Sequence, residues 1–398
     1  MKQIYLDNAA TTRVDDEVLK EMIPYFTENY GNASSMHFKG QEAKLAMEKA
    51  RKIIAKEIGA KSEEIIFTSG GTEANNLTLK GLFFWNKENE TGKNHIIATR
   101  IEHDCILNTC KWLERQGARI TYLDVDAEGF VNLEELKKEL TDKTIVVSVI
   151  HGNNEIGTIQ DLEAIGKICR EKNVLFHTDA CQSFTKTLID VKKQNLDLVT
   201  LNAHKIHGPK GVGALYIRDG IKIVPLFHGG GHEKKVRSGT ENVSGIVGFG
   251  KAVEIANKKN VEHMIKIRNK IIDGILKIPN TRLNGALPLG EVKKGLFKKA
   301  PQEKRLCNNI NVSFNNIEGE SIGGYLETFG ICTSTGSACA SHSLETSHVL
   351  KAIGLLPVQA NSTLRISISK YTTEEEADFL LEKLPQVVEK LRKMSPIN

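Results

Sequence analysis

Lys205 stands where an amine could act as a nucleophile. It follows an apolar run that ends at Leu201, has His204 and His207 as neighbours, and precedes the turn Gly208-Pro209. A lysine that forms a Schiff base needs a rigid position at the end of a strand and surroundings that lower its pKa, and imidazoles beside a tight turn provide both. Most lysines are solvated surface charges, so this segment alone leaves that alternative open.

The segment Thr68-Ser69-Gly70-Gly71-Thr72 is typical of a phosphate-binding turn. A predicted strand ends in two glycines and a threonine before helix-compatible residues, which places free backbone N–H groups and a hydroxyl at a helix N-terminus. Phosphate is stabilised at such a position. The same residues also fit a plain turn from strand to helix with Thr72 as its cap.

Asp179 follows the apolar run Val174–Phe176, at the carboxyl end of a predicted strand. Open α/β sheets bind ligands at that edge. A buried aspartate beside a pyridine nitrogen favours the protonated ring, which is the electron sink that pyridoxal chemistry requires, and Gln182 could reach the phenolic oxygen of the ring. A helix-capping aspartate is the alternative. The order of turn, aspartate and lysine along the chain favours pyridoxal chemistry.

Cys339 is the cysteine whose neighbours suit a mobile thiol. Residues 336–341 are otherwise small, as in an exposed loop, whereas the other cysteines lie in apolar or helical patterns, and Cys332 is expected to pack. Most cysteines are buried packing groups, which is the alternative for Cys339. The seven cysteines include no Cys-x-x-Cys pair, so we expect reduced thiols and predict neither a disulfide framework nor a metal site.

Alternating strand and helix patterns must position these residues. Lys44 to Ile58 has apolar residues at helical spacing and ends at Gly59, a good helix stop. Seven short β-branched runs, mostly separated by helical segments, predict an α/β fold with a mainly parallel seven-stranded sheet and helices on both faces. The runs are Ile65–Thr68, His95–Thr99, Arg119–Asp124, Thr144–Ile150, Val174–Thr178, Leu196–Leu201 and Ala214–Arg218.

A second, smaller α+β domain is predicted beyond about residue 255. A long charged helical stretch there leads to Ile310–Phe314, then to Leu364–Ser369, and then to a closing helix from Thr373 to Lys393. We expect residues 15–258 to form the large domain. Residues 1–14 and 259–398 would form the small domain, which carries the Cys339 loop.

Bulk properties exclude several classes of protein. The chain has 398 residues, 40% of them hydrophobic and 26% charged, which suits one large and one smaller core. It has no run of eighteen apolar residues, and its start lacks the apolar block of a secretory signal, so a cytoplasmic protein without a membrane segment is expected. A net charge of +5 without a basic stripe gives no case for direct nucleic-acid binding.

The segment from Gly285 to Arg305 stands apart because it is punctuated by glycine and proline and is strongly basic. We expect an exposed loop inserted between a helix and a strand. A contact surface for an acidic partner is the alternative.

Taken together, the motifs resemble the cysteine desulfurases of the NifS/IscS type, which are fold-type I pyridoxal-phosphate enzymes. The resemblance runs from residue 5 to about residue 393 and is far more specific than any single motif. It rests on Tyr5–Thr12, Thr68–Asn76, His151–Gly157, the Asp179 and Lys205 segments, Arg237–Asn242 and Ser334–Cys339.

The resemblance implies a role for individual residues around the cofactor. Lys205 would hold pyridoxal 5'-phosphate covalently, Asp179 would pair with the pyridine nitrogen, and Gln182 would meet the phenolic oxygen. His103 would stack on the ring and could take part in proton transfer, although a structural histidine is the alternative. Residues implied at the phosphate or beside the cofactor are Gly71, Thr72, Asn154, Asn202, His204 and, from a neighbouring subunit, Thr240. Asn202 departs from the family, which commonly has a small hydroxyl residue there.

The implied reaction converts L-cysteine to L-alanine. Arg365 would pair bidentately with the substrate carboxylate beside Asn154, Lys205 would remove the α-proton, and Cys339 would take the sulfur as a persulfide. The family is homodimeric, and an iron–sulfur scaffold or a tRNA-thiolating enzyme usually accepts the sulfur. A selenocysteine lyase would share all of these residues. A class V aminotransferase would share the phosphate-type turn, Asp179 and Lys205 but would have no use for a mobile Cys339.

Overall fold

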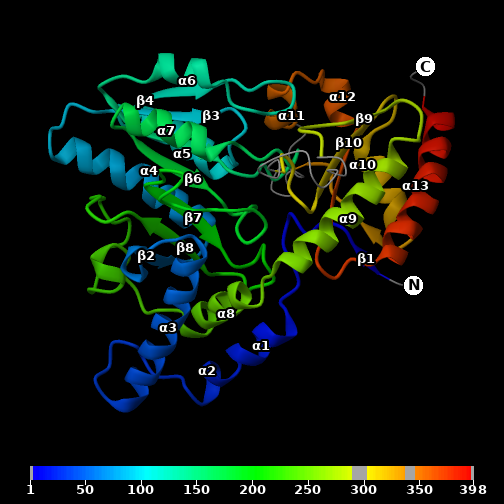
Figure 1. The fold of residues 1–398 in the computed structure, drawn as a ribbon. Helices are drawn as coiled ribbons and strands as arrows, with labels where there is room; N and C mark the ends of the chain where they lie inside the picture. Colours follow the sequence, from blue (N-terminus) through cyan, green and yellow to red (C-terminus); the bar gives the residue numbers. More distant parts are fainter. Residues whose placement is uncertain (1–2, 289–302, 337–345, 396–398) are drawn as a thin grey trace, which may run out of the picture.

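A seven-stranded sheet forms the centre of the larger part of the molecule (Figure 1). The computed structural model describes residues 3–288, 303–336 and 346–395. Every neighbouring pair of strands is parallel except the two pairs that include β8, which is antiparallel to both neighbours. In spatial order the strands are β2 (Ile65–Thr68), β8 (Gly213–Ile217), β7 (Leu198–Asn202), β6 (Leu175–Asp179), β5 (Thr144–Ile150), β3 (His95–Thr99) and β4 (Arg119–Leu123). The predicted mainly parallel sheet is confirmed.

Helices cover both faces of this sheet because successive strand residues point to opposite sides. Ile65 and Phe67 join one apolar core and Ile66 joins the other. The first core is closed by α3 (Phe38–Glu57), α6 (Leu133–Glu139), α7 (Leu162–Glu171) and α8 (Val243–Glu254), and the second by α4 (Gly71–Glu88) and α5 (Asp104–Glu114). The helix predicted from Lys44 starts six residues earlier, after His37, and it ends before Gly59, whose φ is +69°.

A smaller antiparallel sheet lies beside the large one and has its own core. Its order is β12 (Thr363–Ser367), β10 (Asn309–Phe314) and β9 (Thr281–Leu283). The helices α9 (Lys258–Ile275), α10 (Gly319–Glu327) and α13 (Glu374–Met394) pack on it, and α13 begins at Thr373 with a capping box. Two short helices, α11 (His348–Ala352) and α12 (Pro357–Asn361), instead share a core with residues 101–156 of the larger part.

The N-terminal segment runs from the small sheet to the large one (Figure 1). Strand β1 (Ile4–Tyr5) pairs with β11 (Ile331–Cys332), and its apolar residues belong to the core around the small sheet. The chain then passes Asp7 to Thr12 and enters α1 (Asp16–Met22) and α2 (Pro24–Thr27), where Val18 packs into the core of the large sheet. This segment therefore contacts both parts of the molecule.

Two sequence expectations are wrong in part. Gly285–Arg305 was expected to be exposed throughout, but Arg305 is fully buried and donates hydrogen bonds to the carbonyls of Asn284, Ala286 and Asn309. These carbonyls come close to the Arg305 guanidinium only in the folded chain, so the sequence pattern did not indicate its burial. The centre of that segment, residues 289–302, lies outside the described residues. Cys332 was expected to pack but is exposed, because it alternates with the buried Ile331 in the two-residue strand β11.

No described helix is both long and apolar enough to cross a membrane.

Candidate active site

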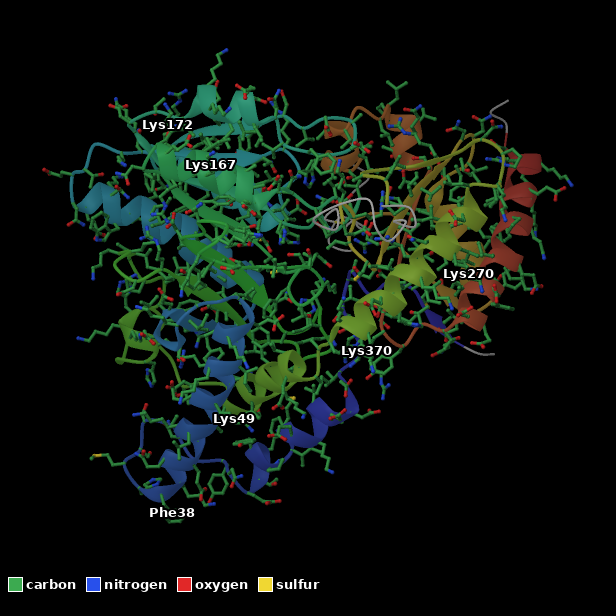
Figure 2. The ribbon with its side chains drawn as sticks, viewed as in Figure 1. Phe38, Lys49, Lys167, Lys172, Lys270 and Lys370 are labelled. Carbon is green, nitrogen blue, oxygen red and sulfur yellow. The ribbon has the colours of Figure 1, made fainter. Side chains whose placement is uncertain are left out.

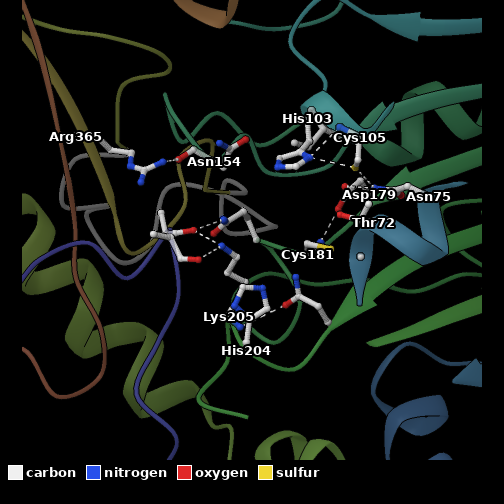
Figure 3. A pocket seen from close by; sticks show the side chains of 16 residues that line it. Thr72, Asn75, His103, Cys105, Asn154, Asp179, Cys181, His204, Lys205 and Arg365 are labelled. Atoms are coloured by element: carbon white, nitrogen blue, oxygen red, sulfur yellow. Dashed lines mark hydrogen bonds between the residues drawn. The ribbon is translucent and has the colours of Figure 1, made fainter. Parts of the chain in front are cut away.

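A cavity of about 220 Å³ opens where β6 and β7 end, between the two sheets (Figure 3). Figure 3 shows Asp179 and Arg365 on opposite sides of it, with Lys205 reaching in between them. Residues from the large sheet, the small sheet and the N-terminal segment all reach it. Those predicted from the sequence are Gly71, Thr72, His103, Asn154, Asp179, Gln182, Asn202, His204, Lys205 and Arg365.

The phosphate-type turn forms where β2 leads into α4. Gly70 is the N-cap, so the free N–H groups of the first turn of α4 begin at Gly71 and could hold an anion. A Cβ added at Gly71 would lie 2.5 Å from Cys181 Sγ, so any larger residue would have to displace the Cys181 side chain. Glu73 fixes the turn, because its Oε2 accepts from Ser69 N at 2.8 Å and its Oε1 accepts from Arg237 Nε at 2.9 Å.

Asp179 is the last residue of β6 and is 4% exposed. Its Oδ1 accepts from Cys181 N at 2.9 Å, which is the capping contact considered from the sequence, while Oδ2 accepts from Asn75 Nδ2 at 2.6 Å. The carboxylate therefore caps the following turn and also lines the cavity. Asn75 was not singled out from the sequence. Its position one helical turn after Gly71, on the same face of α4, was the available signal.

Lys205 lies in the turn three residues after β7. Its Nζ donates to Ala10 O at 2.5 Å and to Ala9 O, both in the N-terminal segment. Burial is the main cause that lowers the pKa of Lys205, to about 8, and the positive charge of Arg365 adds to it. A substantial fraction of the amine is therefore neutral near physiological pH, as a nucleophile or base requires.

Asn202 and His204 flank the cavity on the same side as Lys205. Asn202 is 3% exposed and its Oδ1 accepts from Lys205 N at 3.3 Å. The His204 Nδ1 lies 3.1 Å from Thr11 Oγ1. Burial first, and then the Lys205 charge, lowers the pKa of His204 to about 3, so the imidazole is neutral at neutral pH. Gln182 is also buried here and donates to Ala9 O at 2.9 Å.

Arg365 comes from β12 of the small sheet and is 1% exposed. It donates to Asp7 Oδ1 at 2.7 Å and to Asn154 O at 3.2 Å, while its Nε is buried without a hydrogen-bond partner among the described residues. Arg365 lines the cavity, and its planar guanidinium is suited to bind a carboxylate there. In this state Asp7 supplies the compensating charge.

Two predicted residues remain to be placed. Thr240 is exposed and is not among the residues that line the cavity. Cys339 lies outside the described residues. Residues that line the cavity but were not predicted are Ala9, Ala10, Asn75, Cys105, Ile150 and Cys181. Ala9 and Ala10 contribute backbone carbonyl groups, and the chemistry of their side chains gives no sign of this role.

The described residues contain no cluster of three or more His, Cys, Asp or Glu side chains that could hold a metal ion.

Comparisons with known proteins identify the family of this chain. Residues 4–380 match the family described as aminotransferase class-V. A cysteine desulfurase IscS of Clostridium botulinum is 48% identical over all of this chain and 97% of its own length. A solved NifS-like protein is 41% identical with a TM-score of 0.87 over 98% of this chain and all of its own, and a structure titled SspA in complex with cysteine is 37% identical with a TM-score of 0.80 over 94% of this chain and all of its own.

The chain therefore belongs to the class-V aminotransferase family, a family of pyridoxal-phosphate enzymes, and within it to the group of NifS-like and IscS proteins. The cavity fits that cofactor. The N-terminus of α4, with Gly71 closely packed, suits the phosphate; buried Asp179 suits a protonated pyridine nitrogen; and the Lys205 amine suits covalent attachment.

Proposed function

We propose that this chain is a cysteine desulfurase that releases L-alanine from L-cysteine and takes the sulfur onto Cys339. The observation that carries the proposal is the backbone pairing of Ser334 with Arg365, in which each N–H donates to the other residue's carbonyl. This pairing starts the segment that leads to Cys339 directly beside the residue suited to the substrate carboxylate. The relatives named cysteine desulfurase and the neighbour solved with cysteine support the same substrate.

Both described ends of the Cys339 segment lie next to Glu155. A Cβ at Gly336 would be 3.5 Å from Glu155 Oε2, and Ser347 Oγ donates to the same oxygen at 2.6 Å. Glu155 follows Asn154, which lines the cavity. Because each residue advances a chain by at most ~3.8 Å, Cys339 is tethered within about 11 Å of Gly336. Covalent connectivity thus limits how far the Cys339 Cα can lie from Gly336.

Each step is assigned to a residue of this chain. Arg365 holds the substrate carboxylate, and the neutral Lys205 amine takes the α-proton. When bound, pyridoxal phosphate supplies the electron sink for the carbanion at the substrate Cα. The Cys339 thiolate attacks the substrate sulfur; the new S–S bond forms as the carbon–sulfur bond breaks, and the carbon keeps the electron pair and is protonated to give alanine. Asn154, Gln182, Asn202 and His204 would orient the bound groups.

A homodimer is part of this proposal. Large apolar side chains between residues 19 and 45 are exposed, and Phe38 at the start of α3 is 70% exposed (Figure 2). Exposed apolar side chains gathered on one part of a surface indicate an interaction site. The others are Leu19, Ile23, Phe26, Tyr30, Met36 and Leu45. The exposed Thr240 would then reach the phosphate site of the second subunit.

We also propose the two-domain division, residues 15–258 against 1–14 and 259–398, and a cytoplasmic location. The separate apolar cores of the large and small sheets support the division, although α11 and α12 share a core with the larger part. The persulfide would pass to an iron–sulfur scaffold or a tRNA-thiolating enzyme. The IscS name of the relatives favours the scaffold.

Cys339→Ser tests the proposed function, with Cys332→Ser as the matched control because Cys332 is the exposed cysteine nearest in sequence. In Cys339→Ser the cofactor should still bind, while alanine release and persulfide formation fall by orders of magnitude, because a hydroxyl is barely ionised at neutral pH and accepts sulfur poorly. Alanine is quantified, and mass spectrometry locates the added sulfur. Turnover of L-cysteine at the parent rate in Cys339→Ser would refute the proposal and leave a lyase or an aminotransferase. Parallel assays with L-selenocysteine and with an amino acid plus keto acid separate those two.

A further inference from the structure

Cys105 lines the cavity beside His103 and Asp179, in the first turn of α5, and has no role in the proposed reaction (Figure 3). Its Sγ is 3.1 Å from His103 Nδ1 and 3.2 Å from Asn75 Nδ2. Asn75 Nδ2 also donates to Asp179 Oδ2 at 2.6 Å. The thiol therefore links the histidine expected to stack on the cofactor with the aspartate expected to meet its pyridine nitrogen.

The hydrogen atoms in this chain of contacts can be assigned. The Asn75 amide must turn its NH₂ group toward Asp179, since the opposite orientation would place two acceptor oxygens 2.6 Å apart. The two hydrogens of that NH₂ group then go to Asp179 Oδ2 and to Cys105 Sγ. With the sulfur accepting from Asn75, its own hydrogen is free to point at His103 Nδ1.

The same ring nitrogen has a second donor. His103 is the N-cap of α5, and its Nδ1 accepts the backbone N–H of Cys105 at 3.2 Å. Burial, and then the charge of Asp179, raises the pKa of the Cys105 thiol to about 12, so the S–H keeps its hydrogen at neutral pH. Two donors converge on Nδ1, and among the described residues Nε2 of His103 makes no hydrogen bond.

We propose that Cys105 is a positioning residue that holds His103 in the tautomer with its hydrogen on Nε2 and ties the imidazole, through Asn75, to Asp179. The proposal rests on the proposed function for the identity of the groups that His103 faces. In this tautomer Nε2 carries a hydrogen that it can donate to a bound group, while Nδ1, the acceptor of the ring, is already occupied by Cys105. His103 then cannot serve as the base for the α-proton, which leaves that role to Lys205 alone.

The test is the state of the His103 ring in full-length protein labelled with ¹⁵N-histidine, recorded at neutral pH without and with pyridoxal phosphate. His103→Gln assigns the signal. The wild-type ring should carry hydrogen on Nε2 and none on Nδ1. A wild-type ring with hydrogen on Nδ1 would overturn the proposal whatever the enzyme does with L-cysteine, so its failure is distinguishable from failure of the desulfurase assignment.

Three variants isolate the thiol. Cys105→Ala removes the S–H donor but keeps the backbone donor, and we expect the fraction of ring with hydrogen on Nδ1 to rise several-fold. Cys105→Ser keeps a side-chain donor and should restore the wild-type tautomer. Cys110→Ala, a buried cysteine on the same helix, controls for lost packing and should match wild type. Equal tautomer populations in Cys105→Ala and wild type, or a Cys105→Ser ring like that of Cys105→Ala, would refute the role of Cys105.

Discussion

The two walls of the cavity are built in different ways. On the large-sheet wall, Asp179 and Asn202 end two adjacent parallel strands and Lys205 follows the second. Each of these side chains already bonds to nearby protein groups. On the small-sheet wall, Arg365 projects from an antiparallel strand, and its charge is balanced by Asp7 of the N-terminal segment. The first wall is ordered by one sheet edge, whereas the second depends on how separate parts of the chain pack.

This difference shows which wall depends on distant contacts. Adjacent parallel strands place their carboxyl ends together, so residues that follow them converge wherever the sheet forms. The small-sheet wall forms only when Asp7 and Arg365, which are far apart in the sequence, come into contact. The N-terminal segment joins both walls, because Ala9 and Ala10 bond Lys205 while Asp7 bonds Arg365. Substitutions on the first wall should therefore abolish cofactor chemistry, and those on the second should change substrate binding.

The largest effect is expected for Lys205→Ala on the large-sheet wall. The borohydride-reducible linkage to pyridoxal phosphate should disappear, and alanine formation should fall by at least ~10³-fold, because both the covalent contact and the base are lost. Lys210→Ala, at an exposed lysine in the same turn, is the control and should keep both. Absorbance spectra and reduction followed by mass spectrometry measure the linkage. A cofactor still covalently held in Lys205→Ala would contradict the assignment.

Next in size is the effect of Arg365→Lys on the small-sheet wall, compared with Arg305→Lys. Both arginines are fully buried. Arg305 donates its hydrogen bonds to backbone carbonyls, whereas Arg365 Nε has no hydrogen-bond partner among the described residues. Lysine cannot form the bidentate pair, so Arg365→Lys should raise KM for L-cysteine by roughly 10–100-fold. Arg305→Lys should lower the free energy of unfolding by about 1–3 kcal/mol and leave KM unchanged. Steady-state kinetics measure KM and urea denaturation measures the unfolding free energy. Equal changes in KM for the two variants would contradict the different roles assigned to the two arginines.

A smaller, pH-dependent effect is expected behind the large-sheet wall at Glu102. This carboxyl is fully buried, and burial is the main cause that raises its pKa from 4.5 to about 8. The folded form then binds a proton that the unfolded form releases, so Glu102 costs stability increasingly as pH rises from 4.5 to 8. Its Oε1 accepts from Thr99 Oγ1 and Ile150 N, and a glutamine can keep both bonds.

Glu102→Gln should therefore remove this loss. Between pH 5.5 and 7.5, the unfolding free energy of the variant minus that of the wild type should increase by up to ~1.4 kcal/mol per pH unit. The comparison uses slopes, because the amide NH₂ would occupy the unpartnered Oε2 position and cost a constant amount. Parallel slopes for the two proteins, from urea denaturation at several pH values, would show that Glu102 is ionised in the folded protein.

The smallest effect is expected outside both walls, in the basic insertion. Reversing the charges of Lys293, Lys294, Lys298 and Lys299, which lie outside the described residues, should leave alanine formation with a small-molecule reductant within about twofold, as for a solvated loop. If the insertion instead contacts an acidic sulfur acceptor, persulfide transfer to that acceptor should slow, most at low salt. Transfer rates measured across salt concentrations separate the two alternatives, and a loss of alanine formation would contradict both.

Much of the fold and most of the cavity were predictable from the sequence. The strand runs were found within one or two residues, because apolar periodicity reports which faces are buried. Residues that act through side chains, such as Asp179 and Lys205, carried recognisable patterns. The burial of Arg305 was not predicted, because a basic segment is usually exposed to solvent. Here backbone carbonyls replace water as the partners of the guanidinium, and they come from residues that only folding brings together.

The sequence by itself determined the α/β architecture, the order of turn, aspartate and lysine, and the class of cofactor, since these follow from local patterns and from the edge of a parallel sheet. Only the tertiary structure decided that Asp7 balances Arg365, that the carbonyls of Ala9 and Ala10 receive the Lys205 amine, and that Cys105 lies between His103 and Asn75. The physical reason is that these contacts join segments without a shared periodicity. Their hydrogen bonds and low local polarity exist only once both sheets and the N-terminal segment have packed.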